Sequence, residues 1–477
     1  MKKNEIWWPS RVSGGDPFPA EVDRVSNEGV KLLGAPIGTK KFTSNFVKKK
    51  LQVLKDVCDL LKEVDNAQVE LGLFRGCLSY NKINHLLRTC PPDLLEQALE
   101  QFDEHFQSIL SAILRVPCLA EEQWEQASLP VKFAGLGVNQ TKVIAGPAYM
   151  GSCVLTRGLV AALLKRKEYE PPGLAELLVA HETATSFGHD LADLSTQRSV
   201  QQLLSKERHE VLFQKLTAKS SVRSSNLMLA CSMPHASDWL LAPPIAGLGL
   251  ALLSTQFRTA LKYRLGFALY SEPFPCPALS AEGKTCGIEM DRFGDHAICC
   301  HYGPSLLSRH NNVRDILGHS ARAAGLSAVV TEKKHQIEGS NEKPGDITVQ
   351  QYHRGFASSA FDVTITHPLQ QKYLEIAMEE AGVAAQDAHD KKLQKSLALC
   401  DKEGLHFVPL AWESLGGATE TVHDTLGRWT ELEGARGGYP TALIRRNLYS
   451  QVSCCLARHL AQAVIDRQPE LECDRAL

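Results

Sequence analysis

Acidic residues that could cleave a phosphodiester bond gather in the last third of the chain. Metal-dependent cleavage needs two or three carboxylates to bind a hard cation, and a lysine to orient water or stabilise the developing charge. Glu332 follows an apolar run, Asp346 follows a Pro-Gly turn, and Asp362 stands at the start of a β-branched run. If that run is a strand, Asp362 and Thr364 share one face and Val363 lies on the other. We therefore predict that Asp346 and Asp362, with Glu332, bind Mg²⁺.

The lysine of such a site must come from another element. The position two residues after Asp362 is Thr364, and a polar helix expected at about 383–402 contains Lys391, Lys392 and Lys395. Lys391 and Lys395 are four residues apart and share a helix face, so either could assist the attacking water. Alone, each acid or lysine is more simply a solvated group. Their order along the chain favours a catalytic set.

Cysteine and histidine residues are concentrated within residues 276–301. Zinc needs four nitrogen or sulfur donors in a tetrahedron, and a loop-rich segment with few apolar residues can supply them. Adjacent cysteines leave Cys299 and Cys300 interchangeable, and reduced cysteines in a small core are the alternative to a metal site. The preferred zinc ligands are Cys276, Cys286, His296 and Cys300.

The formal net charge is −2, so contact with nucleic acid must come from local basic patches. We expect Arg309-His310-Asn311 to begin a helix, with Asn311 as its cap and Arg309 at a phosphate near its N-terminus. Solvated helix faces explain the basic residues of the N-terminal half equally well. The residues there expected to contact backbone phosphates are Lys48, Lys49, Lys50, Arg75 and Arg88.

The chain of 477 residues is long enough for several domains. No apolar run follows residues 1–8, so we expect no signal peptide. The longest apolar stretch, near residues 240–253, is interrupted by two prolines, so we expect an intracellular protein that does not enter a membrane. Periodicity predicts helices over most of the first 270 residues, and a single helix from Ala67 to Leu87. Strands are expected at 326–332, 346–350 and 360–366, and near 406–412. The predicted segments are a loop-like start (1–30), a helical region (31–140), a helical connector (141–270), a zinc knuckle (271–303) and an α/β domain (304–477).

Several strings, in order, resemble the C-terminal part of non-LTR, LINE-like retrotransposon reverse transcriptases that carry a restriction-like endonuclease. Residues 31–38 (KLLGAPIG) resemble the end of the palm, and 74–92 and 126–137 resemble thumb helices. Residues 286–300 resemble the zinc knuckle of that family. Arg309-His310-Asn311 resembles a motif that precedes the endonuclease, whose two acids match Asp346 and Asp362.

The resemblance implies a mainly helical, thumb-like N-terminal half, a small zinc-binding knuckle and a PD-(D/E)xK-like nuclease domain. It implies DNA and RNA as partners, Zn²⁺ and Mg²⁺ as the only cofactors, and a nucleus-accessible location. Two departures stand out. The chain has no Asp-Asp pair for polymerase chemistry, and Gly345 separates Pro344 from Asp346. Polymerase activity is therefore not expected. The alternatives to a DNA-nicking protein are a catalytically inactive nucleic-acid-binding module and an inert remnant with only a structural zinc.

Overall fold

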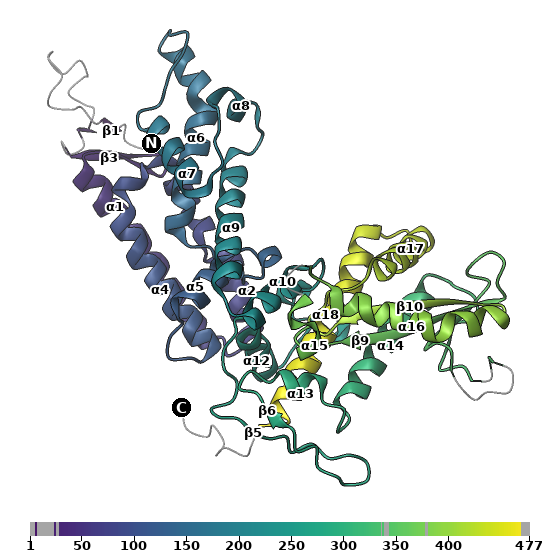
Figure 1. Cartoon of the computed structure of the whole chain (residues 1–477). Coiled ribbons are helices and arrows are strands. Elements are labelled where there is room, and N and C mark those ends of the chain that lie inside the picture. Colours follow the sequence, from purple (N-terminus) through teal and green to yellow (C-terminus); the bar gives the residue numbers. More distant parts are fainter. Residues whose placement is uncertain are drawn as a thin grey trace. The chain divides into compact units, whose positions relative to one another are not determined.

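The computed structural model describes residues 5–6, 23–24, 28–334, 336–337, 343–376 and 380–468 (Figure 1). Helices make up 60% of the structure, with a small sheet near the C-terminus, so the prediction of a mainly helical chain is confirmed at this level. Within the segment predicted to be loop-like, β1 (Glu5–Ile6) pairs in parallel with β2 (Asp23–Arg24). The other residues before 28 lie outside the described residues.

The chain divides into two compact units, each of which is described separately. Unit 1 contains residues 1–65, 73–129 and 137–214, and unit 2 contains residues 66–72, 130–136 and 215–477. The predicted connector, 141–270, contributes to both units.

Unit 1 begins with the antiparallel hairpin of β3 (Gly29–Leu32) and β4 (Ala35–Gly38). Helix α1 (Lys40–Asp59) follows, and the Thr39 hydroxyl caps it by accepting a hydrogen bond from the Phe42 amide at 3.2 Å. The remaining elements are η1 (Leu60–Glu63), the second half of α2 (Ala67–Cys77), η2 (Tyr80–Lys82), α3 (Asn84–Thr89), η3 (Pro92–Leu94), α4 (Glu96–Leu114), α5 (Glu121–Ser128), α6 (Thr141–Leu163), α7 (Leu174–Thr185), α8 (Leu191–Thr196) and most of α9 (Val200–Lys219).

Aromatic packing forms part of the core of unit 1. The rings of Phe102 and Phe106 on α4 lie 4.4 Å apart, and Phe106 meets Phe74 edge-on at 4.9 Å. All three side chains are fully buried. The apolar periodicity that predicts helices in this half of the chain thus corresponds here to the buried face of α4.

One expected helix is two helices. The single helix predicted from Ala67 to Leu87 is wrong, because α2 ends at Cys77 and α3 begins at Asn84. Ser79 has an extended backbone, and its hydroxyl accepts a hydrogen bond from the Asn81 side-chain amide at 3.2 Å. Such local side-chain hydrogen bonds compete with the helical ones.

Helix α6 is long and apolar enough to cross a membrane by length and composition. Its residues Met150, Cys153 and Val154 pack in a buried cluster with Leu174 and Leu204 of the neighbouring helices. A single such helix is weak support for a membrane span, and this packing is that of a core helix.

Unit 2 contains a helical part, a short hairpin and a sheet with its covering helices. The helical part comprises η4 (Val131–Phe133), α10 (Val222–Ser232), α11 (Asp238–Leu241), η5 (Ala246–Leu248) and α12 (Ser254–Arg264). The hairpin of β5 (Phe274–Pro275) and β6 (Glu289–Met290) precedes α13 (Asp295–Cys299). The elements that follow are α14 (Ser305–Ala323), β7 (Val330–Thr331), β8 (Ile347–Gln350), β9 (Ser358–Thr366), α15 (Gln371–Leu374), α16 (Val383–Lys402), β10 (Leu405–Glu413), α17 (Glu420–Gly437) and α18 (Thr441–Ile465).

The four-stranded sheet of unit 2 has the order β10-β9-β8-β7. Strand β8 is antiparallel to both of its neighbours, β7 and β9, whereas β9 and β10 are parallel. The parallel pair needs a crossover, which α16 provides. The predicted helix at 383–402 is therefore confirmed, and α17 is a helix that the sequence did not reveal.

Strand alternation divides the sheet into two faces. Phe361 and Val363 point into a core formed with α14, α17 and α18. Ala360 points to the other face, where it packs against Cys400 of α16. The predicted separation of Val363 from Asp362 is thereby confirmed, and Asp362 lies on the α16 face.

Strand β7 is shorter than predicted. The expected strand at 326–332 is reduced to two residues, because Ala328 and Glu332 have left-handed backbones with φ of 46° and 56°. Non-glycine residues in this region interrupt the extended conformation that strand pairing requires.

Glu413 is a buried acid at the end of β10. Its side chain is 1% exposed, and it accepts hydrogen bonds from the amides of Ala384 and Ala385 in the first turn of α16. Burial raises its pKa to about 7, although these amides favour the charged form. The carboxyl group therefore stays protonated in the folded chain at pH values where it ionises in the unfolded chain.

This difference predicts a pH-dependent stability. Between about pH 4.5 and pH 7 only the unfolded state loses the Glu413 proton, so the free energy of unfolding falls by about 3 kcal/mol as pH rises through this window. Glu413→Gln should lack this decline. Urea unfolding across the window measures the difference between variant and wild type. The exposed neighbour variant Glu420→Gln should follow wild type, and a constant wild-type-to-Glu413→Gln difference would contradict the prediction.

Candidate functional site

Four zinc-type donors meet in unit 2. The Sγ atoms of Cys276 and Cys300 are 3.9 Å apart, those of Cys300 and Cys286 are 3.8 Å apart, and Cys286 Sγ lies 3.5 Å from His296 Nε2. All four donor atoms lie within 4.8 Å of one another. The preferred ligands from the sequence are therefore brought together.

The hairpin and α13 position these donors. Cys276 and Cys286 lie on the two arms next to β5 and β6, and the Cys276 amide donates to the Ile288 carbonyl at 2.8 Å. His296 lies in the first turn of α13, and Cys300 follows its last residue. The Asp291 carboxylate accepts hydrogen bonds from the amides of this first turn, including that of His296 at 2.9 Å. It therefore caps the short helix that presents the histidine.

The distances fit a tetrahedral ion. Zinc–sulfur bonds of about 2.3 Å and zinc–nitrogen bonds of about 2.0 Å give sulfur–sulfur edges of about 3.8 Å and a sulfur–nitrogen edge of about 3.6 Å. The observed spacings differ from these by 0.1 Å at most for the three contacts above. The cluster could hold a metal ion such as zinc.

The directions of their thiol groups distinguish the adjacent residues Cys299 and Cys300. The Cys299 thiol donates to the carbonyls of Asp295 and His296 along α13, at 3.4 and 3.7 Å, and it is not part of the cluster. Cys300 is the fourth ligand of the set. Burial tends to raise the pKa of Cys300, but hydrogen bonds from the Tyr302 amide and from Arg467 outweigh it and lower the pKa. A thiolate is the form that binds zinc.

The predicted acids occupy one row across the sheet. Thr331 pairs with Ile347, and Ile347 pairs with Phe361, so the next residues, Glu332, Asp346 and Asp362, lie opposite one another. The Glu332 amide donates to the Asp346 carbonyl at 2.9 Å, and the Asp346 amide donates to the Phe361 carbonyl at 2.8 Å. The three acids therefore follow one another across the sheet in the same order as along the chain.

Asp346 is paired with a histidine. Its Oδ2 accepts hydrogen bonds from the Val363 amide at 2.7 Å and from His310 Nε2 at 3.1 Å. The hydrogen bond from Asp346 raises the pKa of His310. His310, expected at nucleic acid, is therefore a partner of Asp346.

Asp362 is paired with a lysine. Lys392 Nζ on α16 lies 2.6 Å from Asp362 Oδ2. Burial raises the pKa of Asp362 and the Asp346 charge adds to this, whereas Lys392 acts in the opposite direction. Lys391, predicted as the assisting lysine, pairs instead with Asp387 one turn away at 2.6 Å. Lys395 is exposed, so the lysine at the acids is neither of the two predicted.

Glu332 turns away from the other two acids. Its carboxylate binds Arg314 at 2.7 Å and also contacts Lys343. Within the described residues, Glu332, Asp346 and Asp362 do not form a group whose ligand atoms all lie within 4.8 Å. The expected three-acid Mg²⁺ site is not assembled, and the magnesium stays a prediction.

The expectations for Arg309 and Asn311 need correction. Helix α14 begins at Ser305, so both residues lie inside it and Asn311 does not cap it. The Arg309 side chain is 5% exposed and donates to the Ile298 carbonyl at 3.3 Å, so it braces α13 and does not face solvent. The apolar residues 306 and 307 allow the helix to start one turn before the polar motif.

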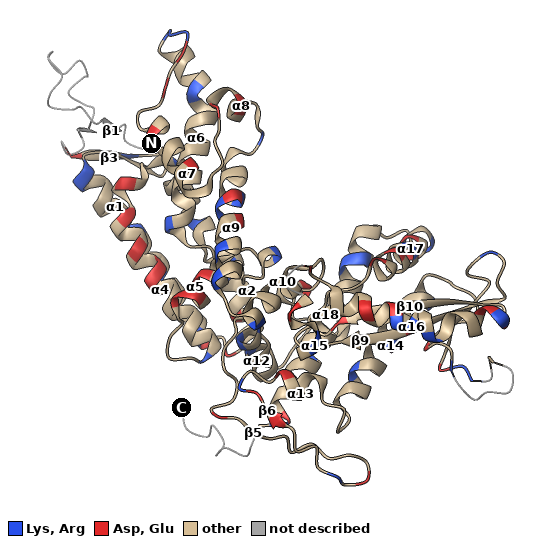
Figure 2. Ribbon diagram, viewed as in Figure 1, with Lys and Arg blue, Asp and Glu red and all other residues tan. Residues whose placement is uncertain are grey.

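Basic residues of unit 1 differ in exposure. Lys48, Lys49 and Lys50 are exposed on α1, whereas Arg75 and Arg88 are half-buried. Basic and acidic residues are interspersed along the helices of both units (Figure 2). The lysine triplet on α1 is therefore a local basic patch. Such a local patch is what we expected in a chain with a net charge of −2.

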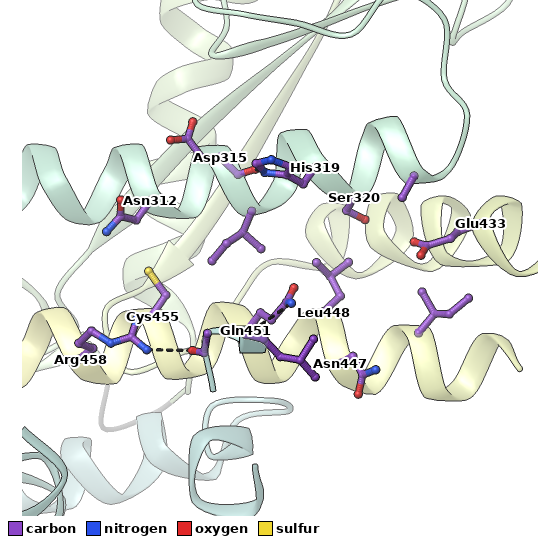
Figure 3. A pocket seen from close by; sticks show the side chains of 15 residues that line it. Asn312, Asp315, His319, Ser320, Glu433, Asn447, Leu448, Gln451, Cys455 and Arg458 are labelled. Atoms are coloured by element: carbon purple, nitrogen blue, oxygen red, sulfur yellow. Dashed lines mark hydrogen bonds between the residues drawn. The ribbon is translucent and has the colours of Figure 1, made fainter. Parts of the chain in front are cut away.

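A cleft of about 540 Å³ lies between α14 and α18. Asp315 and His319 line it from α14, and Gln451 and Arg458 line it from α18 (Figure 3). Arg458 donates to the Gly249 carbonyl at 2.8 Å, and Gln451 donates to a neighbouring carbonyl of the same loop. Gln451 and Arg458 thus attach this loop to α18. The residues that line the cleft belong to neither the acid row nor the cysteine cluster.

Sequence reasoning missed two features. Lys392 could not be preferred over its neighbours without knowing how α16 is rotated on the sheet. A second group of possible ligands, His181, His189 and Glu207 in unit 1, was also missed. Its members are spread over 27 residues without a recognised spacing, so no local pattern predicted it.

No protein-family model matches the chain, and no curated protein matches it.

Cys286→Ser should remove one metal equivalent per chain. A serine hydroxyl stays protonated and is a poor zinc ligand, so the three remaining donors cannot close the tetrahedron. Cys299→Ser should keep the metal, because Cys299 points along α13. Elemental mass spectrometry of the purified variants measures the content. Equal loss in both variants, or none in Cys286→Ser, would contradict the ligand set.

Proposed function

We propose that this chain is a nucleic-acid-binding protein of the non-LTR retroelement type whose C-terminal domain nicks DNA with a divalent metal ion. The observation that supports it most strongly is the pairing of Asp346 and Asp362 on adjacent strands, with Lys392 of the next helix 2.6 Å from Asp362. Two carboxylates and one lysine are what metal-assisted phosphodiester cleavage requires.

The order of elements supports the same proposal. Helix α14, strands β7, β8 and β9, helix α16 and strand β10 form a mixed sheet with helices on both faces. A PD-(D/E)xK-like domain would place its acids where β8 begins and within β9, as Asp346 and Asp362 are placed. The lysine would come from α16, since Thr364 occupies the usual position.

In this proposal each residue has a defined task. Asp346 and Asp362 would hold Mg²⁺, which would supply positive charge beside the phosphate. Lys392 orients the attacking water from the α16 side. His310 must leave Asp346 Oδ2 for the ion to bind, because its Nε2 lies 3.1 Å from that oxygen.

The cysteine cluster supports a DNA-handling role for the region before α14. Zinc would fix the hairpin and α13, and α14 follows α13 within six residues. The knuckle and the helix with His310 would then form one continuous support. DNA and RNA would be the partners, with the exposed lysines of α1 at backbone phosphates.

A catalytically inactive nucleic-acid-binding module is the second candidate. The ion pair of Asp362 with Lys392 and the contact of Asp346 with His310 favour it, because both carboxylates already have a side-chain partner. A metal must displace at least one of these partners.

A nicking assay separates the two candidates. With Mn²⁺ or Mg²⁺, Asp346→Ala and Asp362→Ala should each lower the nicking rate of supercoiled DNA by at least about 100-fold, since each removes a metal ligand. Lys392→Ala should also lose most activity, whereas Lys402→Ala, exposed on the same helix, should not. Equal rates for wild type and the double aspartate variant would refute the nuclease and leave the binding module.

Salt dependence tests the phosphate contacts. Replacing Lys48, Lys49 and Lys50 with Ala should reduce the slope of log affinity against log salt by up to about 3, since each phosphate contact contributes roughly 0.9. The matched control replaces Lys165, Arg166 and Lys167, another exposed basic triplet of unit 1. An equal slope change in both triple variants would contradict a specific role for α1.

A further inference from the structure

A second group of metal-type donors lies inside unit 1, and it takes no part in the proposed function. His181 Nε2 lies 2.9 Å from Glu207 Oε2, and His189 Nε2 lies 2.9 Å from the same oxygen and 3.0 Å from Oε1. The two imidazoles thus converge on one carboxylate.

Three separate segments supply these side chains. His181 comes from α7, Glu207 comes from the middle of α9, and His189 comes from the loop that joins α7 to α8. Ser186 ends α7 in a left-handed backbone with φ of 64°, which turns the loop back toward α9. Buried polar groups are hydrogen-bonded, and buried charges are paired or bind metals.

Burial makes the group unusual. His181 is 0% exposed and Glu207 is 5% exposed, whereas the His189 side chain is 17% exposed. Leu174 of α7, Leu194 of α8 and Leu204 of α9 belong to one buried apolar cluster. A buried carboxylate in such a place needs a compensating cation. His181 presents Nε2 to the carboxylate, and Arg208 Nε donates a hydrogen bond to His181 Nδ1 at 3.4 Å on the other side of the ring.

We propose that His181, His189 and Glu207 form a second metal site, which binds a divalent transition ion of the zinc type. Two imidazoles and one carboxylate are a known zinc donor set, with a fourth position left for water. That position would lie on the side of His189, the most exposed member. The ion would fasten the α7–α8 loop to α9.

Binding requires small local changes. Around zinc, nitrogen–oxygen spacings would be about 3.4 Å, so the groups must separate by a few tenths of an ångström from their present hydrogen-bonding distances. Each imidazole must also carry its proton on Nδ1. Arg208 Nε now lies 3.4 Å from His181 Nδ1 and must turn aside. The competing account is a metal-free cluster in which both rings donate to Glu207.

Cobalt binding to the full-length chain tells these accounts apart. The protein is stripped with a chelator and titrated with Co²⁺ while the visible and near-ultraviolet spectra are recorded. The site with three cysteines gives intense thiolate-to-cobalt charge-transfer bands, and the proposed site gives weak bands without them. All titrations use the Asp346→Ala/Asp362→Ala background, which lacks the ligands of the proposed nuclease site, and there we expect about two equivalents.

The variants assign the second equivalent. Glu207→Gln keeps an oxygen that accepts both hydrogen bonds but binds metal poorly, so it should lose the weak-band equivalent while the fold, checked by circular dichroism, is kept. His189→Ala should lose the same equivalent, and Cys286→Ser should lose only the charge-transfer bands. Glu210→Gln on the next turn of α9 should bind as the background chain does. A background chain, with both aspartates replaced, that binds only the charge-transfer equivalent, or a weak-band equivalent that survives there in both Glu207→Gln and His189→Ala, would overturn the proposal.

Discussion

The partly buried ion pair between Arg223 and Asp295 joins several elements of unit 2. Its two hydrogen bonds are 2.6 and 2.7 Å long, and the Tyr263 hydroxyl donates to the same carboxylate at 2.6 Å. Tyr263 also meets His367, which follows β9 directly. Asp295 precedes the metal-type ligand His296, so one network joins α10, α12, the knuckle and the end of the strand with Asp362.

Strand alternation produces both the core and the acid row of the sheet. Phe361 and Val363 enter the apolar core on one face, and this obliges Asp362 to face α16. Antiparallel register then sets Asp346 beside it. Asp346 contacts His310 and the buried Asp362 contacts Lys392. In the proposed function, the metal ion would compete with His310 and Lys392 for the same oxygen atoms.

Local patterns predicted much of the fold and of the candidate sites. The α4 stripe, the helix at 383–402, the orientation of Asp362 and the four-donor cluster followed from periodicity, turn residues and donor chemistry. What failed depended on tertiary contacts. Lys392 faces Asp362 because of how α16 lies on β9, and Arg309 is buried because α14 begins a turn early. The group of His181, His189 and Glu207 requires the return of a loop onto α9, which no local pattern encodes.

The location of a divalent ion tests the central claim most directly. Crystals of the full-length chain grown with Mn²⁺ would show the ion by anomalous scattering. The account predicts a peak between the carboxylates of Asp346 and Asp362, with the His310 ring turned away from Asp346 Oδ2. Asp346 still bound to His310 and Asp362 still bound to Lys392 at saturating Mn²⁺, with no peak between them, would contradict it.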